Sequence, residues 1–209
     1  MLSFGSPTWQ ASLLSSAKQP SSRTKGNFGR AVASPIVPRL YLSDLTTACS
    51  VDTLERLGIT HIVTVLDIEP PFPEPVLARK RLHISIADRP DAKLLPHLDD
   101  TTAFIRDALA ENDENKVLVH CFMGVSRSAS VVCAYLIATR DMSATSAIAF
   151  VKSKRGIVCP NTGFTLQLEQ YAMEFVKGNG PRATISESIA GRIRKLKDAA
   201  GLAHMHHAS

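Results

Sequence analysis

The stretch that most constrains the fold of this 209-residue chain lies between residues 117 and 139. Residues 117–119 are a compact apolar run that predicts a buried strand, and the mostly apolar residues 128–139 predict a central helix. One short loop joins the two. Strands and helices that alternate in this way along the chain predict an α/β protein with a layered architecture and a largely parallel sheet.

The loop between this strand and this helix brings a thiol and a guanidinium group together. Cys121 follows the strand, and Arg127 stands at the helix start, with five residues between them. A helix N-terminus and a nearby cation lower the pKa of a thiol. The backbone N–H groups of such a loop can bind a phosphate dianion, and Gly124 permits torsions that a Cβ would resist. This arrangement suits thiolate attack on a phosphate ester.

The neighbours of Cys121 add to this chemistry. We expect Arg127 to grip two phosphoryl oxygens with its fork of donors. Ser128 is expected to donate a hydrogen bond to the sulfur, and His120 to bond the backbone and position Cys121. The residues expected to line the phosphate site are Phe122, Met123, Gly124, Val125, Ser126 and Arg127.

The segment His120-Cys-Phe-Met-Gly-Val-Ser-Arg-Ser128 resembles the H-C-x5-R-S signature of the cysteine-based protein tyrosine phosphatases, and is closest to their dual-specificity branch. The resemblance extends over residues 36–177. It implies a three-layer α/β sandwich and a single catalytic domain. It also implies hydrolysis of phosphotyrosine, phosphoserine and phosphothreonine through a cysteinyl phosphate, with phosphorylated proteins as substrates and with no metal or cofactor.

A phosphatase of this kind needs a carboxyl group that protonates the leaving oxygen and later activates water. Asp88 follows a predicted strand at residues 82–86 and matches the family's acid position, whereas Asp91 is its competitor on the same loop. Asn161 matches a family asparagine that braces the phosphate loop. As the N-cap of the next helix, however, Asn161 needs no catalytic explanation.

Two other functions stay open beside the phosphatase. A phosphate-binding adaptor, or pseudophosphatase, would hold phosphorylated partners without turnover, but Cys121, Arg127, Ser128 and an acid are all present. An RNA 5′-triphosphatase would share the fold. The uncharged loop residues Phe122, Met123 and Val125 disfavour phosphoinositides and other polyphosphorylated substrates.

Positive charge is concentrated at the two ends of the chain. The net charge of +5 divides into +4 for residues 1–34, −2 for residues 35–177 and +3 for residues 178–209. The middle segment is therefore predicted to be the catalytic domain, and its slight acidity argues against a nucleic-acid partner.

The two ends have different patterns. Residues 1–34 are rich in serine and contain no acid, which predicts a disordered tail; a mitochondrial transit peptide is the alternative. In residues 178–209, Ile185, Ile189 and Ile193 share one face of a predicted basic helix. That helix either packs on the domain or docks to a partner or an anionic membrane surface.

Cysteine usage and hydropathy bear on the compartment. The four cysteines form no C-x-x-C pair, which indicates a reducing compartment, and no apolar run reaches the length of a membrane span of about 18 residues. We therefore expect a cytoplasmic or nuclear protein, with a mitochondrial location left open by the N-terminus. Cys133 is expected to be a packing residue; the alternative is a disulfide partner for oxidised Cys121.

The remaining elements follow from apolar spacing and from capping residues. We expect strands at residues 36–42 and 62–66, a loop at 69–75, and helices at 51–57, 98–110, 143–151 and from Asn161 or Thr162 to 175.

Overall fold

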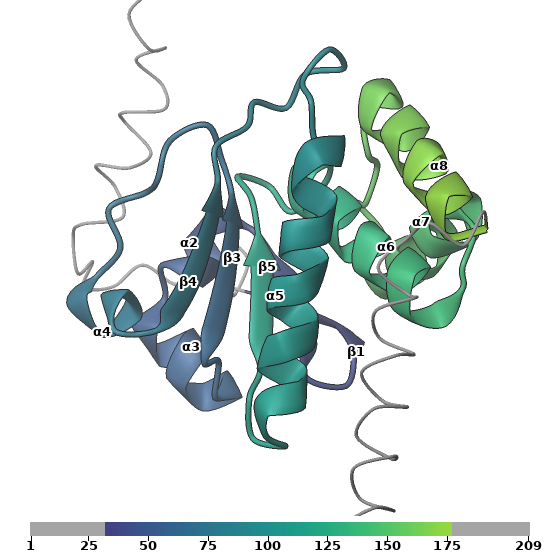
Figure 1. The fold of residues 1–209 in the computed structure, drawn as a ribbon. Coiled ribbons are helices and arrows are strands. Elements are labelled where there is room, and N and C mark those ends of the chain that lie inside the picture. The colour runs from purple at the N-terminus through teal and green to yellow at the C-terminus, as the bar shows by residue number, and fades with distance from the viewer. Residues whose placement is uncertain (1–31, 177–209) are drawn as a thin grey trace, which may run out of the picture.

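The computed structural model describes residues 32–176, which form a five-stranded sheet with helices on both faces (Figure 1). The strand order is β1-β2-β5-β3-β4, and every neighbouring pair is parallel except β1 with β2. The largely parallel α/β sheet expected from the sequence is confirmed. Its strands are β1 (Ser34–Val37), β2 (Leu40–Ser43), β3 (His61–Val65), β4 (Lys80–Ile84) and β5 (Val117–His120).

The helices form two layers, one on each face of the sheet. One layer holds α2 (Leu45–Ala48), α3 (Val51–Leu57) and α4 (Glu74–Leu77). The other holds the 3-10 turn η1 (Leu95–His97), α5 (Leu98–Glu111), α6 (Arg127–Arg140), α7 (Ala144–Lys154) and α8 (Thr162–Val176).

The side chains of β5 show why the sheet needs cover on both faces. Val117 and Val119 pack into the larger core beside α5 and α6, whereas Leu118 packs into the smaller core beside α3 and α4. All three are fully buried. A strand whose alternate residues enter two cores has a continuously apolar sequence, as in other parallel sheets.

The central position of β5 determines where the functional loop lies. Because β2, β5, β3 and β4 are parallel, their carboxyl ends share one edge of the sheet, and the segments that follow Val65, Ile84 and His120 meet there. Ligands of open parallel sheets bind at this edge. Helix α6 then carries the chain away through the core, and Ser128 to Ala138 are buried with one exception, Tyr135.

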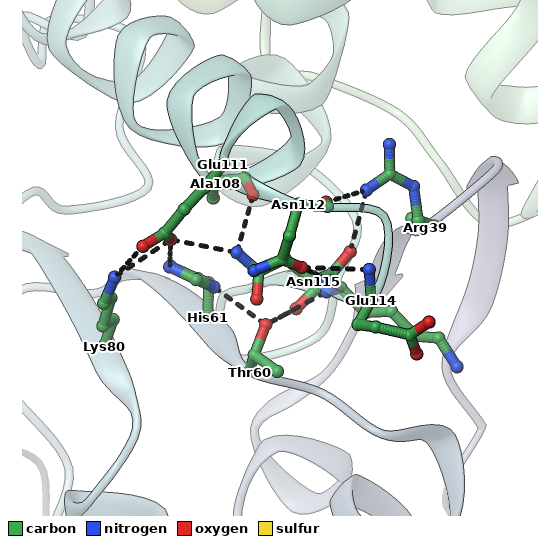
Figure 2. A network of polar contacts seen from close by, with 10 residues as sticks. Arg39, Thr60, His61, Lys80, Ala108, Glu111, Asn112, Glu114 and Asn115 are labelled. Atoms are coloured by element: carbon green, nitrogen blue, oxygen red, sulfur yellow. Dashed lines mark hydrogen bonds and ion pairs between the residues drawn. The ribbon is translucent and has the colours of Figure 1, made fainter.

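The amino ends of the strands carry a polar network that Figure 2 shows. Glu111, at the end of α5, accepts hydrogen bonds from Lys80 Nζ and Asn115 Nδ2, both at 3.0 Å. Thr60 Oγ1 accepts from Lys116 N at 3.0 Å, and Arg39 Nη1 donates to Asn112 O at 2.8 Å. The network thus ties the loop before β5 to the starts of β2, β3 and β4, at the opposite end of the sheet from Cys121.

The prediction of one strand over residues 36–42 was wrong. The chain instead makes two antiparallel strands that turn at Pro38 and Arg39, with Arg39 in the left-handed region at φ 66°. Proline lacks the N–H that a continuous strand would need, so the apolar run on either side of it folds back on itself. The expected loop at residues 69–75 also ends in the short helix α4, which starts at Glu74.

No helix within residues 32–176 is long and apolar enough to cross a membrane. The predictions for the N-terminal tail and for the basic C-terminal helix fall almost entirely on residues 1–31 and 177–209. They lie outside the described residues.

Candidate active site

Cys121 lies at the end of β5 with its sulfur buried beneath the loop that follows. The residue is 1% exposed, and its Sγ accepts hydrogen bonds from Gly124 N at 3.2 Å and Ser128 Oγ at 3.1 Å. Two donors directed at one sulfur stabilise negative charge on it. The loop therefore presents the sulfur as an acceptor, as a nucleophilic thiolate requires.

The carbonyl groups of the loop are held from the outside. Leu45 N donates to Phe122 O at 3.2 Å, and Cys159 N donates to Val125 O at 2.9 Å. Between them, Arg155 donates from Nη2 to Met123 O at 3.1 Å and from Nε to Gly124 O at 3.0 Å. Four consecutive carbonyls are thus bound by neighbouring elements, which fits a loop whose N–H groups are reserved for an anion. Sequence reasoning missed Arg155, because it lies far along the chain from the loop.

Gly124 meets a strict steric requirement. Its φ is 68°, and a Cβ at this position would lie 2.5 Å from the carbonyl oxygen of Ser43 on β2. Only glycine fits this turn without displacing the backbone of Ser43 at the end of β2.

Arg127 forms the floor of the site. Its side chain is 10% exposed, its Nη1 donates to Ile86 O at 3.3 Å, and the same nitrogen lies 3.6 Å from Asp67 Oδ1. Its Nε lies 3.7 Å from Asp88 Oδ2 and has no hydrogen-bond partner among the described residues. A buried guanidinium with an unused donor is suited to bind an anion.

Asp88 is directed at the loop. Its Oδ1 accepts hydrogen bonds from Ser126 Oγ at 2.7 Å and from Asn161 Nδ2 at 2.9 Å, while its Oδ2 faces Arg127. The two donors on Oδ1 leave Oδ2 as the oxygen that can carry a proton toward the site.

Asp91 is turned away from the site. Both of its oxygens accept hydrogen bonds from Arg89, at 3.0 and 2.9 Å, and its side chain is 70% exposed. The hydrogen bonds from Arg89 lower the pKa of the Asp91 carboxyl. In this structure the Asp91 carboxylate therefore binds Arg89 at the surface, away from Arg127 and the loop after β5.

Helix α8 holds the loop of residues 85–94, which carries Asp88 and is called the acid loop below, in place. Asn161 Oδ1 accepts from Phe164 N at 2.9 Å as a helix cap, while its backbone N donates to Ser126 Oγ at 3.1 Å. Two residues further on, a Cβ on Gly163 would lie 1.8 Å from Pro90 O. Asn161 thus contacts the phosphate loop and the acid loop, in addition to capping the helix.

Gln167 adds a second attachment between α8 and the acid loop. Its Oε1 accepts from the backbone N–H groups of Leu94 and Leu95, at 2.7 and 2.8 Å, and its Nε2 donates to Ala92 O at 2.9 Å. Sequence reasoning had no signal for the positioning role of Gln167 or of Gly163, because neither residue type is reactive.

His120 is fully buried behind Cys121. Its Nε2 lies 2.9 Å from Thr64 Oγ1 and its Nδ1 lies 3.4 Å from Cys121 O. Burial lowers the pKa of His120 to about 4, so the ring is neutral at pH 7. The ring also lies edge-on to Phe72.

A cleft of about 380 Å³ opens above Arg127 and Asp88. Leu45, Leu66 and Phe122 give it apolar walls, and the loop after β3 lines its far side. Of the loop residues expected to meet substrate, Phe122 and Arg127 line this cleft; Ser126 is buried against Asp88, and Met123 is 57% exposed.

All four cysteines are free. Cys133 lies inside α6 within the larger core, where burial raises the pKa of its thiol to about 12. Such a thiol is inert at neutral pH.

Comparison with known proteins places this fold and loop in one class. The family model described as "Dual specificity phosphatase, catalytic domain" matches residues 40–174. The chain belongs to this family, within the cysteine-based protein tyrosine phosphatases, as its loop sequence indicated.

Individual relatives agree with this assignment. The chain is 41% identical over 135 residues to Dual specificity protein phosphatase MPK-4 of Drosophila melanogaster, which covers 63% of this chain and 34% of that protein. It is 35% identical over 147 residues to Dual specificity protein phosphatase 1B of Arabidopsis thaliana, which covers 70% and 84%. The crystal structure of DUSP15 superposes with a TM-score of 0.67 at 28% identity, over 74% of this chain and 95% of that one.

The matched region is only part of several of these relatives. The chain spans 34% of the Drosophila protein and about a fifth of two further curated relatives.

Proposed function

We propose that this protein is a dual-specificity protein phosphatase that hydrolyses phosphotyrosine, phosphoserine and phosphothreonine through a cysteinyl-phosphate intermediate. The observation that carries the proposal is the convergence of Cys121 Sγ, the unused Arg127 donor and the Asp88 carboxyl at one edge of the sheet. Membership of the family supports the same reaction.

The first step transfers the phosphoryl group to the enzyme. The Cys121 thiolate attacks phosphorus, the bond from phosphorus to the ester oxygen breaks, and Asp88 gives its proton to that oxygen. Arg127 and the loop N–H groups hold the equatorial oxygens as the geometry at phosphorus changes.

The second step returns the enzyme to its starting state. Asp88, now a carboxylate, takes a proton from water, the hydroxide oxygen attacks phosphorus, and the phosphorus–sulfur bond breaks to release inorganic phosphate. Ser128 donates to the sulfur at 3.1 Å, which stabilises the departing thiolate.

The placement of Asp88 supports its assignment as the acid. Asp88 faces Arg127, whereas Asp91 binds Arg89 at the surface. The carboxylate that approaches the phosphate site is therefore Asp88 in this proposal.

A turnover assay tests the function. The full chain should hydrolyse p-nitrophenyl phosphate and peptides that carry phosphotyrosine, phosphoserine or phosphothreonine. Cys121→Ser should abolish turnover of all four and still bind vanadate. Wild-type protein that binds phosphopeptides without turnover would instead identify a phosphate-binding adaptor.

We also propose that residues 35–177 are the catalytic unit and that the basic ends determine location or partners. The support is the charge distribution and the match to residues 40–174. Removal of residues 178–209 should leave turnover of p-nitrophenyl phosphate intact. Fluorescent fusions of the full chain and of a chain that lacks residues 1–34 would separate a cytoplasmic or nuclear location from a mitochondrial one.

A further inference from the structure

We propose that the cleft selects substrates in which a basic residue lies beside the phosphorylated residue. In this proposal the Asp67 carboxylate binds the positive charge of that basic residue. The inference rests on the proposed phosphatase function and names a class of substrate for the same site. The Asp67 carboxylate lines the cleft but takes no part in the proposed reaction.

Asp67 is placed beside the phosphate site by the end of β3. Its Oδ1 lies 3.6 Å from Arg127 Nη1, its side chain is half-exposed, and it lines the cleft. Its backbone carbonyl accepts a hydrogen bond from Ser85 Oγ at 2.9 Å, which holds this loop against the segment after β4. The backbone of Asp67 is therefore held in place, and its carboxylate lies beside Arg127, close to where a bound phosphate would lie.

Phosphate binding changes the balance of charge around Asp67. Among residues 32–176, Arg127 is the cation within ion-pair distance of Asp67. A phosphate dianion on Arg127 occupies that guanidinium, so that the Asp67 carboxylate faces a like charge across a partly enclosed cleft. A cation supplied by the substrate beside its phosphorylated residue would lie between the two and relieve this repulsion.

The other charges of the cleft do not supply that cation. Glu69, Asp88 and Arg127 are the remaining charged residues that line it. Glu69 is already paired with Arg81, with Oε1 and Nη1 2.6 Å apart, so Arg81 is engaged. A substrate with a second phosphate would add negative charge where the cleft already has an excess of it, and should bind poorly.

The cleft also suits the shape of a basic side chain. Ile68 and Pro70 lie beside Asp67 on the same loop and line the cleft together with Leu66. Long basic side chains lay their methylene stems on apolar surface and keep the charged head at a polar group. A lysine or arginine next to the phosphorylated residue could therefore pack on this wall and reach the Asp67 carboxylate.

Matched phosphopeptides test the inference. Three phosphotyrosine peptides differ only in carrying lysine, glutamine or glutamate at the two positions that flank the phosphotyrosine. We expect kcat/KM to favour lysine over glutamate by about three- to tenfold at low ionic strength, with the preference shrinking in added salt. Asp67→Asn should reduce the preference to less than about twofold.

Two control variants locate the effect. Glu69→Gln should keep most of the preference, because Arg81 already neutralises Glu69. Asp113→Asn should change nothing, since its side chain is fully exposed beside Arg39, at the opposite end of the strands. Equal kcat/KM for the three peptides, or an Asp67→Asn variant that keeps the preference, would overturn the inference.

The outcome is separable from that of the proposed function. If all three peptides are hydrolysed at equal rates, the proposed phosphatase function stands and only the proposed role of Asp67 is overturned. If neither the peptides nor p-nitrophenyl phosphate is hydrolysed, the proposed phosphatase function is wrong. Calorimetric binding of the same peptides to the full chain then tests the charge preference, and equal affinities would overturn it.

Discussion

At the scale of single residues, the site depends on geometry that chemically similar side chains cannot supply. Arg127 contributes a buried, planar fork whose Nη1 donates to Ile86 O, while its Nε is buried without a hydrogen-bond partner among the described residues. A lysine would keep the charge, but its ammonium is a compact point charge without the planar fork that matches two phosphoryl oxygens.

Arg127→Lys should therefore lower kcat/KM for p-nitrophenyl phosphate by about 10²-fold or more. The measurement is steady-state kinetics with a thermal unfolding curve to verify folding. A folded variant within a few-fold of wild type would show that the loop binds phosphate without the bidentate contact.

Asp88 and Asp91 give a second contrast between neighbouring carboxylates. A phenol of low pKa leaves without a proton donor, whereas a serine alkoxide does not. Asp88→Asn should therefore slow alkyl phosphates far more than activated aryl phosphates, and should remove the limb of the pH–rate profile on which activity falls as the acid deprotonates. Asp91→Asn should do neither. The reverse pattern would assign the acid to Asp91.

At the scale of elements, the site is assembled by segments that are remote in sequence. β5 and the start of α6 supply Cys121 and Arg127, and the loop after β4 supplies Asp88. Helix α8 holds that loop through Asn161 and Gln167, and through the close approach of Gly163 to Pro90.

A methyl group at residue 163 tests this arrangement. Gly163→Ala would place a Cβ where Pro90 O now lies, so the acid loop must move away from α8. We expect kcat/KM for alkyl phosphates to fall by about tenfold or more, with a smaller loss of vanadate affinity, because the added Cβ meets Pro90 of the acid loop and no atom of the phosphate loop. Gly156→Ala is the matched control, since a Cβ there meets nothing within 4 Å. Equal, small effects of both variants would contradict a positioning role for α8.

The elements also show what sequence patterns reveal. Helix α3 is capped by Ser50 and ends at Gly58 in the left-handed region, as its residues predicted. The helices α2 and α4 and the turn η1 were missed, because one turn is too short to repeat an apolar spacing. The turn at Pro38 and Arg39 was missed because the apolar residues on either side continue one alternation, although Pro38 itself was a signal against a continuous strand.

The residues of the site also fall into those that could be predicted from the sequence and those that could not. The residues that the structure brings together, Cys121, Arg127 and Asp88, could be predicted because thiol, guanidinium and carboxyl groups have recognisable chemistry and lie in loops that follow strands. Arg155, Gly163 and Gln167 could not, because their roles arise from contacts between α7, α8 and loops that no local pattern encodes.

At the scale of the whole molecule, burial of neutral histidines links stability to pH. Burial lowers the pKa of His120 to about 4 and lowers that of His61 as well. An unfolded chain takes up protons at these residues near pH 6.5, whereas the folded chain resists until lower pH. The stability that neutral His120 provides is therefore fully present above pH 6.5 and is lost as the pH falls toward 4.

We expect the free energy of unfolding in urea to fall by up to about 3 kcal/mol between pH 7 and pH 4 on account of His120. In His120→Gln this dependence should be much weaker, whatever the stability of the variant at pH 7. An unchanged pH dependence in that variant would show that His120 titrates normally in the folded protein.

The central claim is that the Cys121 sulfur becomes covalently phosphorylated during turnover. Rapid acid quenching of the Asp88→Asn variant during hydrolysis of p-nitrophenyl phosphate, followed by peptide mass spectrometry, tests it directly, because slow hydrolysis should let the intermediate accumulate. The account predicts phosphate on the peptide that contains Cys121, and none on any peptide when Cys121→Ser is treated in the same way. Phosphate on another residue, or turnover by Cys121→Ser, would contradict it.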